Sequence, residues 1–329
     1  MPTIYLDVLL LQSLYVNYFL LRAAAKLTHT PLGWLRCGLA AAGSSLFSLL
    51  ILLPPLPVLL QLLLKLLAAA AAQGETVLRG AAREPEISDL AAFLNRCGGC
   101  VQGAGTSTIR VQGRRMLYSC SFAPMADRIV ASTLACACAA AGGRVELTGC
   151  RPETYAPLLE ILAQMGCRVE TGPESAVITR LGALHGAGRV FTGVYPALAT
   201  DAAPLLAAAM LAADSASSIE DVVFERRFGC AEGFAAFGAA VQVQGRTLDI
   251  RPVRQLQGAC ARAADLRGGA ALVVAALAAR GRSRITDTGY IDRGYAGFAQ
   301  MLAELGAQIE REMPRESASE KKTPSKKQI

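Results

Sequence analysis

The chain has little of what metal sites and nucleic-acid surfaces require. Its 329 residues include only two histidines, His29 and His185, one tryptophan and 6% aromatic residues. The pair Cys97-x-x-Cys100 has no second ligand pair at a suitable spacing, so the sequence does not predict a zinc site. Most of the net charge of +7 comes from residues 1–72 and from the tail after Glu310, with no basic stripe between them. A nucleic-acid partner is therefore not expected.

Charged residues are also scarce, at 18%, whereas hydrophobic residues make up 53%. Ten cysteines are present, and two of them, Cys136 and Cys138, lie within one long apolar run. Free cysteine behaves as a small hydrophobic residue in a reducing compartment. We therefore interpret the cysteines as buried core residues.

An aspartate precedes each of three long runs of small and apolar residues, at Asp127, Asp201 and Asp265. The intervals are 74 and 64 residues. An aspartate at this position is typical of a helix N-cap, because its carboxylate accepts the free N–H groups of the first turn. Each run is apolar on nearly every face, which predicts a buried helix.

A second landmark repeats in step with the first. Glycines at positions 98, 166, 238 and 306, spaced 68, 72 and 68 apart, each end a helical pattern and are followed by the pattern of a strand. A period near 70 is longer than that of solenoid repeats. It predicts an α/β fold made of repeated units, each with a buried helix beneath a sheet.

If the three buried helices run the same way, their N-termini meet at one end of the domain. Such ends attract anions. Asp201 and Asp265 would stand there, with Arg227 and Arg293 in nearby loops, which suits a substrate with a phosphate, a carboxylate and a hydroxyl to deprotonate. The alternative is structural: the aspartates are caps and the arginines their ion partners. Spacing alone favours that alternative.

The first 72 residues contain three apolar runs, at residues 4–21, 37–53 and 56–72, the last interrupted by Lys65. The first is long enough to span a bilayer, so we expect a membrane anchor of two or three helices. The basic loop between the first two runs predicts an external N-terminus. Everything after residue 72 is then cytoplasmic with three spans and external with two.

Two resemblances follow from specific stretches. The segments IYLDVLLLQSLYVNYFLLRAAAKL and LLPPLPVLLQLLLKLL resemble the membrane region of the sporulation sigma-factor processing peptidases (SpoIIGA). From residue 73 to about 311 the chain resembles the C-terminal half of the UDP-N-acetylglucosamine 1-carboxyvinyltransferases, of the enolpyruvyl transferase family. The stretches behind this are AAREPEISDLAAFLN, GAGTSTI, DRIVAST, YPALATDAAPLL, VFERRF, ADLRGGAALVVA and IDRGY.

The second resemblance implies an inside-out α/β barrel with helices within and sheets outside. It divides the chain into an anchor (1–72), a remnant of the first transferase domain (73–123), a near-complete second domain (124–311) and a disordered tail (312–329). It implies enolpyruvyl transfer from phosphoenolpyruvate to UDP-N-acetylglucosamine, in peptidoglycan precursor synthesis at the cell membrane, with no metal or organic cofactor.

The same resemblance assigns roles to individual residues. Asp201 matches the aspartate proposed to take the proton from the 3′-hydroxyl of the sugar, and Val223 matches a contact to the UDP-sugar. Arg227, Asp265 and Arg293 match residues around the phosphoenolpyruvate site, where Asp265 counts with Asp201 as catalytic.

The chain departs from the family in ways that predict weak or absent activity. The family's first part, with a lysine–asparagine pair and a mobile loop bearing a catalytic cysteine, has no match here. Arg226 and Ala199 replace the usual asparagine and proline, and Ala202-Ala203 replaces the usual Met/Gln. A separate chain supplying the missing half is therefore a candidate partner.

Three alternatives remain open. A membrane-tethered domain could bind a UDP-sugar or a partner protein without catalysis. Asp287-Thr288-Gly289 matches the motif of aspartic peptidases, in which two such aspartates pair, and this would suit a sporulation membrane peptidase. A gene fusion near residue 72 would have no selected function.

Overall fold

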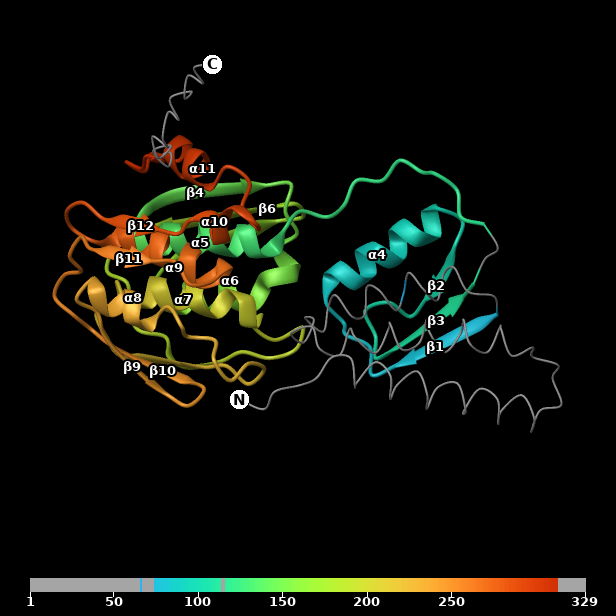
Figure 1. Cartoon of the computed structure of the whole chain (residues 1–329), viewed down its shortest axis with the longest axis horizontal. Coiled ribbons are helices and arrows are strands. Elements are labelled where there is room, and N and C mark those ends of the chain that lie inside the picture. The colour runs from blue at the N-terminus through green and yellow to red at the C-terminus, as the bar shows by residue number, and fades with distance from the viewer. Residues whose placement is uncertain (1–65, 67–73, 114–115, 313–329) are drawn as a thin grey trace, which may run out of the picture.

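The computed structural model describes residues 66, 74–113 and 116–312, which form two hydrophobic cores (Figure 1). The predicted runs 4–21 and 37–53 and the tail lie outside these residues. Within the described part of the chain, no helix is both long and apolar enough to cross a membrane. The membrane anchor therefore stays a prediction.

The smaller core belongs to a unit that begins the described chain. Its strands are β1 (Glu75–Arg79), β2 (Cys100–Gln102) and β3 (Thr108–Gln112), which pair antiparallel in the order β1-β3-β2. Helix α4 (Pro85–Arg96) begins at a proline and contributes Ile87, Ala91 and Leu94 to the core. The i, i+4, i+7 spacing of these residues gives the helix one apolar stripe. We call this part, residues 74–113, the small unit.

Leu66 is helical, fully buried and part of the same small core. It lies in the third apolar run, before the predicted domain boundary at residue 72. At least this residue of the run packs with the folded small unit.

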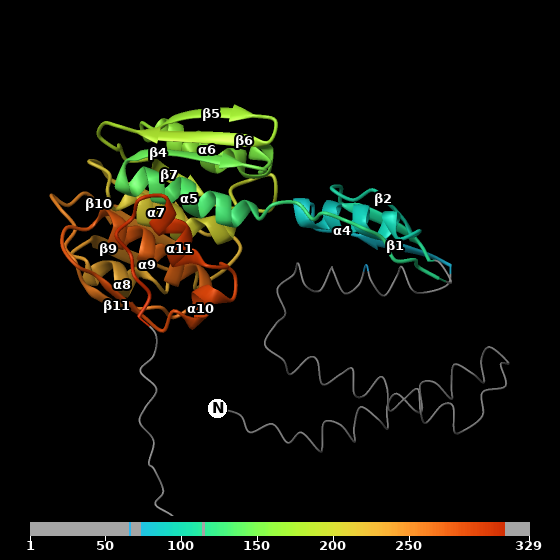
Figure 2. The same ribbon diagram turned by 90° about the horizontal axis from the view of Figure 1, so that it is seen from above.

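Three inner helices, α5 (Arg128–Ala141), α7 (Ala203–Met210) and α9 (Leu266–Ala278), form the centre of the larger core. Each packs on the other two, and together they lie inside a ring of strands and shorter helices (Figure 2). All eight residues of α7 are buried. Alanine and glycine dominate these helices, which lets three backbones approach closely while the core stays densely packed. We call residues 127–312 the main domain.

The outer layer of the main domain consists of sheets and short helices. One sheet has the order β4-β6-β5, a second β7-β8-β10-β9, and a third pairs β11 with β12 in parallel. The strands are β4 (Gly143–Thr148), β5 (Arg168–Gly172), β6 (Ser175–Arg180), β7 (Gly188–Phe191), β8 (Ser217–Glu220), β9 (Ala240–Gln244), β10 (Thr247–Arg251), β11 (Cys260–Arg262) and β12 (Arg284–Thr286). The outer helices are α6 (Ala156–Gln164), α8 (Ala231–Ala236), α10 (Gly289–Asp292) and α11 (Phe298–Glu304), with a 3₁₀ turn η2 (Pro152–Tyr155) before α6.

The repeat read from the glycines is confirmed in atomic detail. Helices α4, α6, α8 and α11 each end two residues before their glycine. Gly98, Gly166, Gly238 and Gly306 have φ of 88°, 103°, 78° and 97°. At every one, the N–H of the next residue donates to a carbonyl five positions back, as from Gly99 to Leu94 and from Ala307 to Leu302. This is the Schellman end, which needs a left-handed residue. Four copies of one helix–turn design therefore build both cores.

Two predicted strands differ from the structure. The run SSIEDVVF at residues 217–224 predicts one strand, but β8 stops at Glu220. The Asp221 carboxylate accepts the N–H groups of Val223 and Phe224, each at 2.8 Å, and turns the chain. After Gly306 no strand forms among the described residues.

Candidate active site

The three aspartates that precede the inner helices do not act alike. Asp127 caps α5, accepting from Ile129 N at 2.7 Å, and Asp265 caps α9, accepting from Gly268 N at 2.7 Å. Asp201 makes no capping hydrogen bond and lies within the 3₁₀ turn η3 (Thr200–Ala202) that leads into α7. The cap predicted at Asp201 is therefore wrong, and its carboxylate is available for other contacts.

Two arginines hold that carboxylate. Arg227 Nη2 lies 3.2 Å from Asp201 Oδ1, and Arg267 Nη2 lies 3.2 Å from Oδ2, to which Arg267 Nε also donates at 3.2 Å. Both arginine side chains are only 14% exposed, whereas that of Asp201 is 39% exposed. A carboxylate that is paired with two largely buried arginines, and is itself still partly exposed, is oriented for contact with a ligand.

Arg227 is itself held on several sides. Its Nε donates to Thr200 Oγ1 at 3.0 Å and lies 3.4 Å from Asp221 Oδ2, and its guanidinium stacks 4.2 Å from the ring centre of Phe224. Asp221 is fully buried, so its charge requires the partners that surround it. Thr200 Oγ1 donates to Asp221 and completes the group.

Asp221 also shapes the loop that carries the predicted sugar contact. Because it accepts from Val223 N and Phe224 N, it turns the chain outward after β8. Val222, Val223 and Phe224 are consequently 46%, 41% and 45% exposed. No role was predicted for Asp221, although an aspartate that directly follows a strand and precedes two apolar residues is a turn signal.

Arg267 is the other residue that the sequence analysis missed. It lies two positions after the Asp265 cap, so the first turn of α9 directs it toward the start of α7. Burial lowers the pKa of Arg267, but the charge of Asp201, together with the neighbouring Tyr295, outweighs this and raises it, so the guanidinium stays cationic. It lies 5.6 Å from the ring centre of Tyr295, whose hydroxyl is 2.9 Å from Thr133 Oγ1 in α5. This chain of contacts shows that the starts of α5, α7 and α9 do converge.

One donor at this site has no partner. Arg267 Nη1 is buried and makes no hydrogen bond within the described part of the chain. An unpaired buried N–H is costly.

The remaining predicted residues are less closely tied to this group. Asp265 is exposed and serves as the α9 cap. Arg293 is exposed after α10 and has no ion pair among residues 74–113 and 116–312. Its neighbour Gly294 packs on Leu266, the first residue of α9. The structure joins Asp201 to Arg227, and places Arg293 only near the same helix end.

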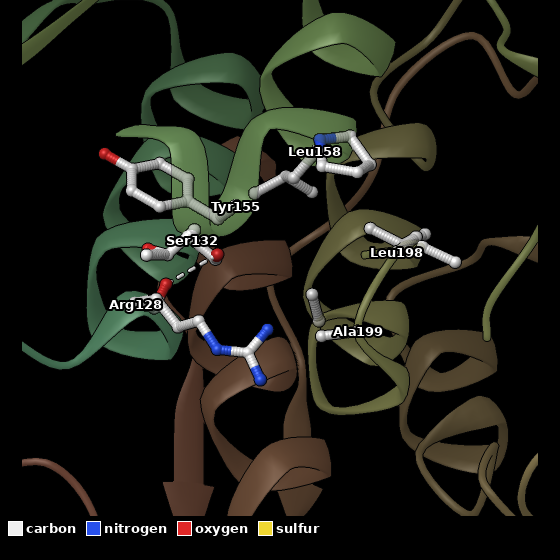
Figure 3. Close-up of a pocket in the computed structure, with 10 residues that line it drawn as sticks. Arg128, Ser132, Tyr155, Leu158, Leu198 and Ala199 are labelled. Carbon is white, nitrogen blue, oxygen red and sulfur yellow. Dashed lines mark hydrogen bonds between the residues drawn. The ribbon is translucent and has the colours of Figure 1, made fainter. Parts of the chain in front are cut away.

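Beside the site lies a cavity between the starts of α5 and α7, lined by Arg128, Ser132, Leu158 and Ala199 among others (Figure 3). Ser132 Oγ donates to the Arg128 carbonyl at 2.7 Å. The volume of this cavity is about 10 Å³, which is room for roughly one water molecule. The cavity therefore cannot hold a substrate, and the exposed face of Asp201 is the candidate site.

The chain is similar to a known protein family over most of its length. A sequence model of EPSP synthase (3-phosphoshikimate 1-carboxyvinyltransferase) matches residues 61–302. The chain belongs to this enolpyruvyl transferase family. The match begins within the third apolar run, in agreement with the burial of Leu66 in the small core.

Curated relatives refine the similarity. The chain is 41% identical over 245 residues to a UDP-N-acetylglucosamine 1-carboxyvinyltransferase of Finegoldia magna, and 41% identical over 243 residues to one of Trichlorobacter lovleyi. Each alignment covers 74% of this chain and 58% of the relative. The chain thus spans less than two thirds of the length of the relatives it matches.

Solved structures support the fold. The enolpyruvyl transferase NikO from Streptomyces tendae is similar with a TM-score of 0.64 and 29% identity, over 74% of this chain and 58% of that one. EPSP synthase from Acinetobacter baumannii shares the fold, with a TM-score of 0.58 at 22% identity over 75% of this chain and 60% of that one. The predicted enolpyruvyl-transferase-type α/β architecture is confirmed for the described residues.

A second family model, sporulation factor SpoIIGA, matches residues 3–76. The resemblance predicted for the first 70 residues is therefore confirmed. The two matches overlap at residues 61–76, which cover the end of the third apolar run and the four residues after it.

Proposed function

We propose that this chain carries the acceptor side of an enolpyruvyl transfer site for UDP-N-acetylglucosamine. The observation that carries the proposal is the Asp201 carboxylate, fixed by Arg227 and Arg267 and open on its front face. About 40% identity to relatives named for that reaction supports the choice of sugar nucleotide.

In the proposed reaction Asp201 accepts the proton of the 3′-hydroxyl of the sugar. The hydroxyl oxygen bonds to C2 of phosphoenolpyruvate, and C3 of phosphoenolpyruvate gains a proton. Loss of the C3 proton and of phosphate then restores the double bond in the product. Arg227 and Arg293 would face the phosphate and carboxylate of phosphoenolpyruvate, and Val223 the UDP-sugar. Asp265 would act from the start of α9.

We propose further that the chain by itself turns over poorly, because about two fifths of the length of its relatives has no counterpart in it. A separate polypeptide carrying the remaining transferase repeats would then be needed for full rate. The N-terminal segment that matches the SpoIIGA model would hold the transferase on the cytoplasmic side of the cell membrane. A peptidoglycan precursor enzyme acts on that side.

The test is thermal unfolding of the full chain in detergent, with and without UDP-N-acetylglucosamine and phosphoenolpyruvate. A ligand that binds only the folded state raises the unfolding midpoint. We expect a rise that Asp201→Ala abolishes and that Glu146→Ala, which removes an exposed carboxylate from β4, leaves intact. Absence of any rise at millimolar ligand would overturn the proposal.

A second candidate is a tethered sugar-nucleotide-binding domain without catalysis, favoured by the short span of the match. It predicts the same rise in midpoint but no phosphate release from phosphoenolpyruvate, even when the missing repeats of a relative are added as a separate chain.

The peptidase alternative gains little from the geometry of its motif. Asp287 lies between β12 and α10, has a left-handed φ of 56° and is ion-paired with Arg262. A helix, not a strand, follows it. An aspartic peptidase needs two such carboxylates facing each other. Peptidase activity lost on Asp287→Ala would restore this alternative.

A further inference from the structure

The segment that joins the small unit to the main domain, residues 116–127, runs back along α4 and is attached to it at several points. Tyr118 N donates to Cys97 O at 2.8 Å, and the Tyr118 ring covers Gly98, where an added Cβ would lie 2.9 Å from the ring. Further along, Phe122 packs edge-on against Phe93 with ring centres 5.5 Å apart. We call these residues the connecting segment.

One of these attachments is a pair of thiols. Cys97 Sγ, at the end of α4, lies 3.1 Å from Cys120 Sγ in the connecting segment. Cys97 is 7% exposed and Cys120 is half-buried, so solvent reaches Cys120 more readily. A disulfide needs sulfur atoms about 2 Å apart, so bond formation here takes only about 1 Å of movement.

The other cysteines differ from this pair. Outside this pair, five of the seven described cysteines are buried, in agreement with the expectation that cysteines serve as core residues. Burial raises the pKa of Cys230 to about 12 and that of Cys167 to about 11, and neither thiol is in hydrogen-bond contact with a second thiol among the described residues. Cys260 is exposed but has no thiol partner in the described chain.

We propose that Cys97 and Cys120 form a reversible disulfide that fastens the connecting segment to the small unit. With hydrogen peroxide as the oxidant, the Cys120 thiol becomes a sulfenic acid and one water is released. Cys97 then attacks that sulfur, a second water leaves, and the S–S bond forms. A small dithiol reverses the step by thiol–disulfide exchange and is itself oxidised.

The protonation of Cys97 sets the pace of the second step. The hydrogen bond with Cys120, together with burial, raises the pKa of Cys97. Because the thiolate is the nucleophile, we expect disulfide formation to be faster at higher pH. When Cys97 and Cys120 are reduced, the connecting segment is free to detach from α4. When the disulfide forms, the segment is held to the end of α4.

Peptide mapping of the full chain tests the proposal. Cleavage after Arg96, Arg110, Arg115 and Arg128 releases residues 97–110 and 116–128. After treatment with peroxide and blocking of free thiols, we expect these two peptides to be linked, and to separate on addition of dithiothreitol. The link should vanish in Cys97→Ser and Cys120→Ser, and persist in Cys100→Ser and in the exposed control Cys260→Ser.

Two results would overturn it. One is the absence of linked peptides in the wild-type chain at a peroxide concentration that oxidises Cys260. The other is a link that survives Cys97→Ser, which would assign the bond to Cys100. Hydrogen exchange gives a second readout in the wild-type chain: residues 116–122 should exchange at least several-fold more slowly when oxidised, and an unchanged rate would refute the fastening role.

Discussion

The small unit and the main domain are built from the same helix–turn design, yet they stabilise it differently. In the main domain three inner helices pack on one another, so α7 is buried along its whole length. In the small unit a single outer helix covers a three-stranded sheet with a core of seven buried residues, Leu66 included. One repeat has only its own sheet to pack on, and shared burial is what gives a repeat fold its stability.

The two units also differ in that only the main domain contains the candidate site. The starts of α5, α7 and α9 converge only because three repeats share one centre, and Asp201, Arg227 and Arg267 meet there. The small unit has one glycine helix end of the repeat, at Gly98, but no such convergence among its described residues. The candidate site therefore requires several repeats. A single repeat forms its own small core without them.

The largest expected effect comes from truncating matched core leucines. Leu206→Ala in α7 removes a fully buried side chain from the shared centre and should destabilise the main domain by about 3–5 kcal/mol. Leu94→Ala in α4, at 2% exposure, should cost about 2–3 kcal/mol and loosen only the small unit.

Urea unfolding followed by hydrogen exchange on both units measures this difference. Leu181→Ala, at 89% exposure, is the control and should stay within about 0.5 kcal/mol of wild type. If Leu94→Ala loosened α7 as much as α4, the two cores would be one cooperative unit.

Removing the carboxylate at the site should have the next largest effect. Asp201→Ala leaves Arg227 and Arg267 without their shared anion and should cost about 1–2 kcal/mol, less than for a sealed pair because Asp201 is 39% exposed. Thermal unfolding of the ligand-free protein measures it. Adding Arg267→Met to this variant should recover part of the loss, and a further loss instead would show that Arg267 stabilises the fold independently of Asp201.

A smaller effect is expected where the two units touch. Arg128 Nε donates to Glu86 Oε1 at 2.8 Å, with side chains 9% and 32% exposed. Arg128→Met should cost about 1 kcal/mol, discounted for the solvent access of Glu86, and Glu86→Gln less. A double-mutant cycle isolates the coupling; zero coupling would mean that the ion pair does not hold the units together.

The smallest effect concerns acid stability of the main domain. Hydrogen bonds from Ser215 and His185 lower the pKa of Asp214, whose Oδ2 lies 2.8 Å from His185 Nδ1. A carboxyl whose folded pKa is depressed stabilises the fold above its unfolded pKa of about 3.9, and this is lost as the pH falls through the folded pKa. Asp214→Asn should therefore lower the unfolding midpoint slightly at pH 7 and not at pH 2. An equal difference at both values would assign the effect to packing.

The sequence by itself determined the repeat. Gly98, Gly166, Gly238 and Gly306 mark the outer helix ends because a left-handed residue is required there, and this requirement is local. Asp127 and Asp265 were likewise predicted as caps, and the Ala-rich runs as buried helices, from neighbours within one or two turns.

Only the tertiary structure decided which residues meet. Asp201 looks like the other two aspartates in sequence, but its carboxylate pairs with Arg227, 26 positions on, and with Arg267, 66 positions on. Arg267 could not be found from the sequence because its role depends on the angle at which α7 and α9 approach, whereas the turn that Asp221 makes after β8 is local. Helix packing fixes that angle through side-chain shape across the whole core, which a local pattern does not encode.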